Sequence, residues 1–147
     1  METETYSPFC LGEQNMKTED ILNLDCTKEN NLEQINKFLW KVKPVARILE
    51  KNHYTKTKQV QLELLEQALH GIMLRYGYRT QGINTYYEEG ENKENKENKF
   101  VFYTVSLLKI RDTREWIGNV YGKTLWEIVA KAIIKVYADL KKEKEEQ

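Results

Sequence analysis

The fold is decided by residues 100–140, which read FVFYTVSLLKIRDTREWIGNVYGKTLWEIVAKAIIKVYADL. Residues 100–110 are rich in β-branched and aromatic side chains, which favour strands. Alternation places one set of them on a common face: Val101, Tyr103, Val105 and Leu107. Residues 115–121 form a second run of this kind after the turn-like RDTR. From residue 125 apolar side chains recur every three or four positions, so the stretch predicts two antiparallel strands followed by a helix.

The corner before this helix contains Gly122, Lys123 and Thr124, which resemble the end of a nucleotide-binding P-loop. The rest of that motif is missing, because Ile117 stands where its first glycine belongs. Thr124 and Glu127 instead have the spacing of a capping box, in which each side chain accepts from the other residue's amide. We expect a strand-to-helix corner that holds no nucleotide.

The predicted helix has one apolar and one polar side. The core side carries Leu125, Val129, Ala132, Ile133, Val136 and Leu140. The opposite side, which we expect to face solvent, carries Glu127, Lys131, Lys135 and Asp139.

Toward the N-terminus, the apolar spacing predicts a long helix that ends at Gly77 in a left-handed cap, followed by a strand over residues 79–87. A shorter helix over residues 28–43 is stopped by Pro44, which can open a new turn. The fold class is therefore α+β. We predict an α-β-β-β-α sandwich with a three-stranded antiparallel meander, preceded by one or two short helices.

Residues 27–142 are predicted to form this single domain. Residues 1–26 lack a helical period and are expected to be a flexible acidic tail, whose end Ile21, Leu22 and Leu24 can attach to the core. Residues 88–99 contain Glu-Asn-Lys three times in succession and predict a mobile loop, because they offer no apolar surface to bury. Residues 143–147 are expected to be a charged tail.

Composition narrows the class of protein. The 147 residues have a formal net charge of zero, and no apolar run approaches the roughly 18 residues that span a membrane. Cys10 and Cys26 show no paired spacing, so we expect reduced thiols in a soluble, cytoplasmic protein.

The charge is unevenly distributed along the chain. Residues 1–36 hold eight acids and two lysines (net −6), and residues 37–58 hold seven basic residues and one acid (net +6). We expect these blocks to neutralise each other, although an anionic partner is the alternative.

The element order from residue 58 resembles that of double-stranded RNA-binding domains, although only Lys123 stands where that family has a basic cluster. The turn into the last helix is also similar to that of small α/β sandwich proteins encoded by bacteriophages. The residues that carry this second similarity are Gly122, Thr124, Glu127 and Ala130. It covers the last ~70 residues and suggests a phage or mobile-element lineage but no activity, because a fold does not fix a function. We predict a small, non-enzymatic binding or regulatory protein of that lineage.

Nothing in the sequence predicts an enzyme, a cofactor or a metal site. Glu66 and His70 lie one helical turn apart, but no second histidine or cysteine joins them at ligand spacing. Ser7 and Ser106 lack the context of a nucleophile.

We therefore predict a protein that docks a protein partner through aromatic and arginine side chains on or beside the sheet. The candidate residues are Tyr86, Tyr87, Arg111, Arg114, Trp116 and Tyr121. Self-association is a further possibility, and a helix over residues 28–43 that covers this face is the alternative.

The second functional hypothesis is a nucleic-acid-binding accessory protein that contacts RNA or single-stranded DNA through residues 37–58. Its candidate residues are Lys41, Lys43, Arg47, Lys51, Lys56 and Lys58. The competing interpretation is that Trp40 packs in the core while the lysines coat a solvated surface.

Overall fold

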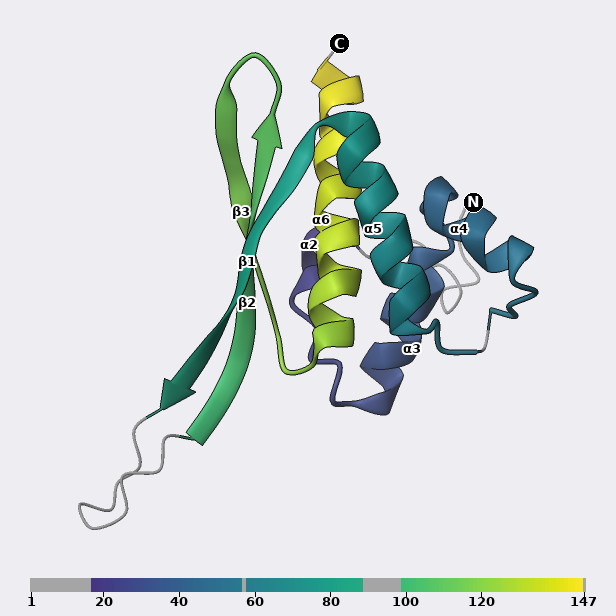
Figure 1. The fold of residues 1–147 in the computed structure, drawn as a ribbon. Coiled ribbons are helices and arrows are strands. Elements are labelled where there is room, and N and C mark those ends of the chain that lie inside the picture. Colours follow the sequence, from purple (N-terminus) through teal and green to yellow (C-terminus); the bar gives the residue numbers. More distant parts are fainter. Residues whose placement is uncertain (1–16, 57, 89–98, 147) are drawn as a thin grey trace, which may run out of the picture.

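The structure, a computed structural model, describes residues 17–56, 58–88 and 99–146 (Figure 1). Four helices precede the sheet: α2 (Thr18–Leu22), α3 (Glu29–Leu39), α4 (Lys43–Lys51) and α5 (Leu62–Tyr76). Strands β1 (Tyr78–Glu88), β2 (Lys99–Ile110) and β3 (Arg114–Gly122) follow, and α6 (Leu125–Glu146) ends the chain. The predicted α+β class with a three-stranded antiparallel sheet is confirmed.

The helices of the described residues all lie on one side of the sheet (Figure 1). The strand order is β1-β2-β3, so each strand pairs with its neighbour in sequence. Helix α6 is the centre of the molecule, since it contacts β2 and β3 as well as α2, α3 and α5. Its residues Ile133, Ile134 and Val136 are fully buried. The core is thus a layer between the sheet and the helices.

The helix boundaries follow the chemistry of two residues. Pro44 lies in the first turn of α4, where the missing amide hydrogen removes no helical bond. Gly77 ends α5 in the left-handed conformation, with φ 74°, and its amide donates to the carbonyl of Met73 at 3.0 Å. The predicted end at Gly77 is confirmed, and so is the new helical turn at Pro44. The helix predicted over residues 28–43 is corrected, because α3 already ends at Leu39 and Lys43 begins α4.

Irregularities in register shape the sheet. The β1–β2 pairing shifts between Gln81 and Asn84 and again between Tyr86 and Tyr87, and the β2–β3 pairing shifts between Leu107 and Leu108. Each β-bulge increases the local twist. The far ends of β1 and β2 bend away and project beyond the helices (Figure 1).

Two predicted tails are corrected. Residues 17–26 belong to the folded domain, because they include α2 and Ile21 is buried in the core. Leu22 and Leu24 pack against that core as expected. Residues 143–146 continue α6 and do not form a separate tail. The rest of the predicted N-terminal tail and residues 89–98 of the predicted loop lie outside the described residues.

The prediction that the polar side of α6 faces solvent is also wrong for the first turns of this helix. Glu127 and Lys131 are only 2% and 4% exposed, because the chain after α2 covers them.

Among the described residues, no helix combines the length and the apolar character needed to span a membrane.

Candidate functional site

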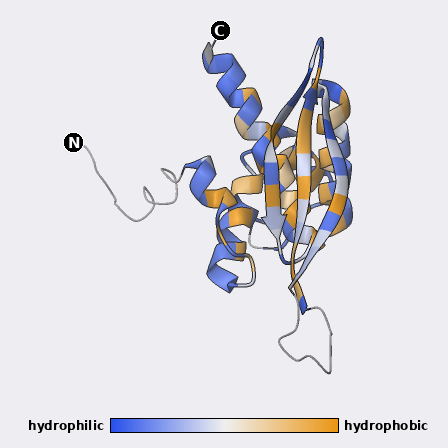
Figure 2. Ribbon diagram, turned by 90° about the vertical axis from the view of Figure 1, so that its left-hand side faces the viewer, coloured by the Kyte–Doolittle hydropathy of each residue, from blue (hydrophilic) through white to orange (hydrophobic). Residues whose placement is uncertain are grey.

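No described element covers the face of the sheet that is turned away from the helices (Figure 2). Residues paired across neighbouring strands share a face, so the register defines its rows. From one end to the other the rows are Ile110–Arg114, Arg79–Leu108–Trp116, Gln81–Ser106–Asn119, Asn84–Thr104–Tyr121 and Tyr86–Phe102. We call these residues the outer face. Helix α3 packs against α6 on the other side of the sheet (Figure 1), so the alternative in which the helix over residues 28–43 covers this face is wrong.

Three rings lie together at one end of the outer face. Tyr86 and Phe102 are stacked with centroids 4.8 Å apart, and Tyr121 meets Phe102 edge to face at 5.5 Å. The exposed fractions of Tyr86 and Tyr121 are 53% and 51%. Such ring pairs contribute about 0.5–1.5 kcal/mol beyond burial, so this group is held in place before any partner arrives.

Trp116, the most exposed aromatic side chain among the described residues, is also fixed in orientation. Its Nε1 donates to Oδ1 of Asn119 at 3.1 Å, and Oγ of Ser106 donates to the same oxygen at 2.7 Å. The exposed fraction of Trp116 is 60%. An indole whose Nε1 is bonded to an asparagine that is itself held by Ser106 loses little freedom when it is covered.

Tyr87 does not belong to the outer face, and this part of the prediction is corrected. The register shift at this point lies in β2, where Val101 is an extra residue between Phe100 and Phe102. Strand β1 alternates normally here, so Tyr86 and Tyr87 point to opposite faces. Tyr87 contacts Phe100 at 6.0 Å, and Phe100 contacts Tyr103 at 4.7 Å. Tyr103 packs against the hydrophobic core, which places this second group on the helix side of the projecting strands.

Arg111 is engaged within the chain, whereas Arg114 is exposed on the outer face. The guanidinium of Arg111 contacts Glu143 of α6 at 2.5 Å and donates to the carbonyl of Tyr76 at 3.2 Å. It also lies over the ring of Tyr78. Arg111 therefore fastens the β2–β3 turn to α5 and α6, and it is not free to serve as a partner contact.

Arg111 is one member of a polar cluster beneath the sheet. Lys109 lies 3.1 Å from both Asp139 and Glu143, and the hydroxyl of Tyr78 donates to Asp139 at 2.5 Å. The bond from Arg111, followed by that from Lys109, lowers the pKa of Glu143 to about 2 despite some burial. Burial and the bond to Asp139 raise the pKa of Tyr78. Burial alone would lower the pKa of Lys109, but its bonds to Glu143 and Asp139 outweigh it and raise that pKa.

This cluster predicts a loss of stability in acid. The pKa of Glu143 is about 2 in the folded protein against an ordinary 4.5, so its charge stabilises the fold fully above about pH 4.5. That contribution is lost as the pH falls from about 4.5 toward about 2. Urea titrations should show that Glu143→Gln lowers the free energy of unfolding at neutral pH, and that its difference from the wild type shrinks by about pH 3.

The control is Glu115→Gln, because Glu115 is 64% exposed and lies 3.8 Å from Lys109. Its effect should stay below about 1 kcal/mol at both pH values. A Glu143→Gln difference of constant size from neutral to acid pH would contradict the assignment.

The second set of candidate residues lies on the helical side, away from the outer face (Figure 1). The six side chains of the basic stretch are all exposed: Lys41, Lys43, Arg47, Lys51, Lys56 and Lys58. Within the described residues none of the six pairs with a carboxylate, so the expected neutralisation by the acidic block is not seen at these positions. Lys41 lies over the ring of Phe38, and Lys58 lies over that of Tyr54. Trp40 is half-buried against the core, as the competing interpretation expects.

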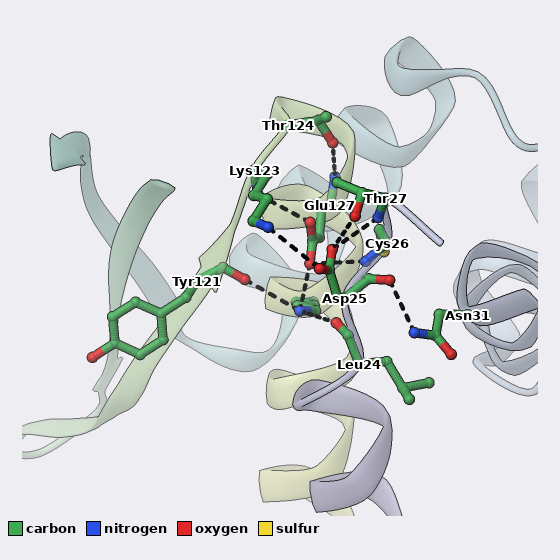
Figure 3. Close-up of polar contacts among 10 residues, drawn as sticks. Leu24, Asp25, Cys26, Thr27, Asn31, Tyr121, Lys123, Thr124 and Glu127 are labelled. Atoms are coloured by element: carbon green, nitrogen blue, oxygen red, sulfur yellow. Dashed lines mark hydrogen bonds and ion pairs between the residues drawn. The ribbon is translucent and has the colours of Figure 1, made fainter. Parts of the chain in front are cut away.

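The corner between β3 and α6 holds a buried ion pair that the sequence analysis missed (Figure 3). Nζ of Lys131 lies 2.6 Å from Oε2 of Glu127, and it donates to the carbonyls of Leu24 at 2.6 Å and Tyr121 at 3.3 Å. Oε1 of Glu127 accepts from the amide of Lys123 at 3.0 Å, one residue before the predicted partner Thr124. The other half of the capping box is confirmed, since the amide of Glu127 donates to Oγ1 of Thr124 at 3.1 Å.

These contacts join the chain around Leu24 to β3 and to the start of α6. We call the buried ion pair of Glu127 and Lys131, with its backbone partners, the latch. All three donors of the Lys131 ammonium and both oxygens of the Glu127 carboxylate have partners within the chain. Burial, followed by the charge of Glu127, raises the pKa of the neighbouring Cys26 to about 12, so its thiol stays protonated. The described residues contain no group of three His, Cys, Asp or Glu side chains that could hold a metal ion.

Comparison of the chain with protein-family models, with curated proteins and with solved structures found no match. The resemblances to double-stranded RNA-binding domains and to small bacteriophage proteins therefore stay predictions. Function has to be argued from the two surfaces themselves.

Proposed function

We propose that the chain is a non-enzymatic binding or regulatory protein that docks a partner protein through the outer face. The observation that carries this proposal is an uncovered sheet face on which Tyr86, Trp116 and Tyr121 are each more than half exposed. Tyrosine, tryptophan and arginine are the residues that contribute most of the energy at protein interfaces. A protein gains nothing for its own stability by leaving such large apolar side chains in water.

The charges of the outer face indicate the chemistry of the partner. Its rows contain Arg79 and Arg114 and no aspartate or glutamate. A second copy of the chain would bring four arginines to one interface without a carboxylate from these rows to pair them. A partner that presents apolar side chains flanked by carboxylates fits better.

Ring geometry favours a polypeptide over nucleobases on this face. Base stacking needs a free ring face, as in single-strand-binding proteins. Phe102 already has one face against Tyr86 and a second ring contact with Tyr121. This group therefore offers fewer free ring faces than a stacking platform, and it offers ring edges and tyrosine hydroxyls, which suit side chains and backbone groups of a peptide.

Selection from a random-peptide display library tests the proposal. We expect peptides enriched on the wild-type protein to combine aromatic or aliphatic anchors with aspartate or glutamate. Their affinity should fall by at least about tenfold for the variant Trp116→Ser/Tyr121→Ser, because each lost anchor removes buried apolar contact. Both positions are exposed, so thermal unfolding should change little.

Leu74→Ser is the matched control. Leu74 is 73% exposed on α5, so its substitution removes an exposed apolar side chain that does not belong to the outer face. Peptides that bind the sheet variant as tightly as the wild type, or a selection without any acidic and apolar consensus, would disprove this assignment.

A further inference from the structure

A groove on the helical side joins residues that are far apart in the sequence. It has a volume of about 270 Å³ and lies between the start of α4, the end of α5 and the last turns of α6. Its floor is apolar and is formed mainly by Val42, Ile72, Tyr76, Tyr137 and Leu140. We call it the lysine groove, for the residues of its rim.

The rim is entirely cationic. Lys41 and Lys43 come from the turn before α4 and from its first residue, and Lys141 and Lys144 come from α6. No aspartate or glutamate lines the groove. None of the four lysines forms an ion pair with another described residue. Four unpaired ammonium groups around an apolar floor repel one another, and an anion between them would relieve that repulsion.

The size of the groove indicates a ligand that extends beyond it. Pockets that enclose drug-sized molecules measure about 300–1,000 Å³, so this one holds only part of a larger molecule. Cations continue from its edge along α4, where Lys43, Arg47 and Lys51 follow at four-residue spacing and share one side of the helix. An extended row of this kind suits a polyanion.

We propose that the lysine groove binds single-stranded nucleic acid, with a base on its tyrosine-lined floor and phosphates at the lysine rim. Lysine ammonium groups bind phosphate as point charges and can bind carboxylates in the same way, so it is the aromatic floor that favours an unpaired base over an acidic peptide. The half-buried rings of Tyr76 and Tyr137 line the floor, and each has a contact of its own, with Arg75 and with Phe38 respectively. An unpaired base would pack on the parts of these two rings that remain exposed. The proposal is independent of the outer face, because it concerns the opposite side of the molecule.

The site corrects the predicted basic surface in one respect. The sequence hypothesis used residues 37–58 alone, and it assigned the C-terminal lysines to the last turn of a helix and a tail. The structure brings Lys141 and Lys144 beside Lys41 and Lys43. The adjoining cavity of about 620 Å³ shares Lys41, Tyr137 and Lys141 with the groove. It is lined by lysines together with Glu19, Asp139 and Glu145, so its charge is mixed and we do not include it in the site.

Fluorescence anisotropy with a labelled single-stranded oligonucleotide of mixed sequence, as DNA and as RNA, tests the groove in the full chain. We expect Lys141→Glu/Lys144→Glu to weaken binding at least tenfold at low salt. The control Lys28→Glu/Lys142→Glu makes the same change in net charge at exposed lysines outside the groove, and should weaken binding less than about threefold. The plot of log affinity against log salt should become shallower by about 1.4 in the groove variant, because each lost phosphate contact contributes about 0.7.

Three further probes define the ligand. A duplex of equal length and an oligonucleotide with abasic sites should both bind more weakly than the intact single strand, because they offer no unpaired base. Poly-glutamate of matched charge should compete poorly. Equal loss in the groove and control variants, equal affinity for the abasic strand, equal competition by poly-glutamate, or no binding of either strand at low salt would each overturn the proposal.

Circular dichroism and thermal unfolding show whether the variants remain folded. Lys141→Gln/Lys144→Gln gives a second variant without new negative charge, and it should show the same direction of change. A failure here leaves peptide selection on the outer face unaffected, so the two proposals fail separately.

Discussion

Replacing Lys131 with methionine is expected to destabilise the protein by about 3–5 kcal/mol, because it leaves the carboxylate of Glu127 buried without its cation. The two side chains are 5% and 3% exposed and lie 2.6 Å apart. The substitution also removes the hydrogen bonds to the carbonyls of Leu24 and Tyr121. Urea titration followed by circular dichroism measures the loss as a lower midpoint with little change in slope.

The control for this prediction is Lys123→Met. Lys123 is 52% exposed in its ion pair with Asp25, so its loss should lower stability by less than about 1 kcal/mol. The double variant Glu127→Gln/Lys131→Met should recover part of the loss, since no uncompensated charge remains and the glutamine oxygen can still accept from the amide of Lys123. Equal effects of Lys131→Met and Lys123→Met would contradict a buried latch.

The second large effect is expected for Asn36→Ala, which should lower the free energy of unfolding by about 2–4 kcal/mol. Asn36 is 4% exposed, and its amide group donates to the carbonyls of Lys56 and Lys58 while its oxygen accepts from the amide of Val60 at 3.1 Å. Truncation leaves the buried amide of Val60 without a partner. It also releases the segment that leads into α5.

Asn52→Ala provides the comparison, since Asn52 donates to the carbonyl of Ile48 at 2.7 Å but is exposed. Water can replace that bond, so the cost should stay below about 1 kcal/mol. Thermal unfolding of both variants ranks them directly. An Asn36→Ala protein as stable as Asn52→Ala would show that the side chain does not brace the segment.

The elements of this fold are predictable because they depend on local chemistry. Pro44 suits the first turn of a helix and Gly77 ends one, each through its own backbone properties. The alternation of β2 and the three- and four-residue spacing of α6 arise from each element burying one side. These signals are complete within about twenty residues of sequence.

Burial of polar residues is not predictable in this way. Glu127 and Lys131 have the i,i+4 spacing of an exposed pair, and only the chain around Leu24, more than one hundred residues earlier, turns them into a buried one. Residues 143–146 have the composition of a solvated tail, yet Glu143 receives Lys109 and Arg111 from the sheet. Partners from distant segments decide both cases.

The two candidate surfaces show the same difference between local patterns and contacts from distant segments. Strand parity was enough to predict that some aromatics face away from the helices, but Tyr86 and Tyr87 cannot share a face, and the part played by Phe102 was missed. A strict count of alternate positions along β1 would have separated the two tyrosines. The lysine groove joins residues about one hundred positions apart, so no local sequence pattern predicts it.

The latch also constrains how the chain reaches its native state during synthesis. Leu24 leaves the ribosome well before its partner Lys131, which lies 107 residues further on in α6. That helix contacts the sheet as well as α2, α3 and α5, so these elements lack their common packing partner until α6 has been synthesised. Premature termination before α6 would release a polypeptide whose apolar surfaces stay open to aggregation and proteolysis.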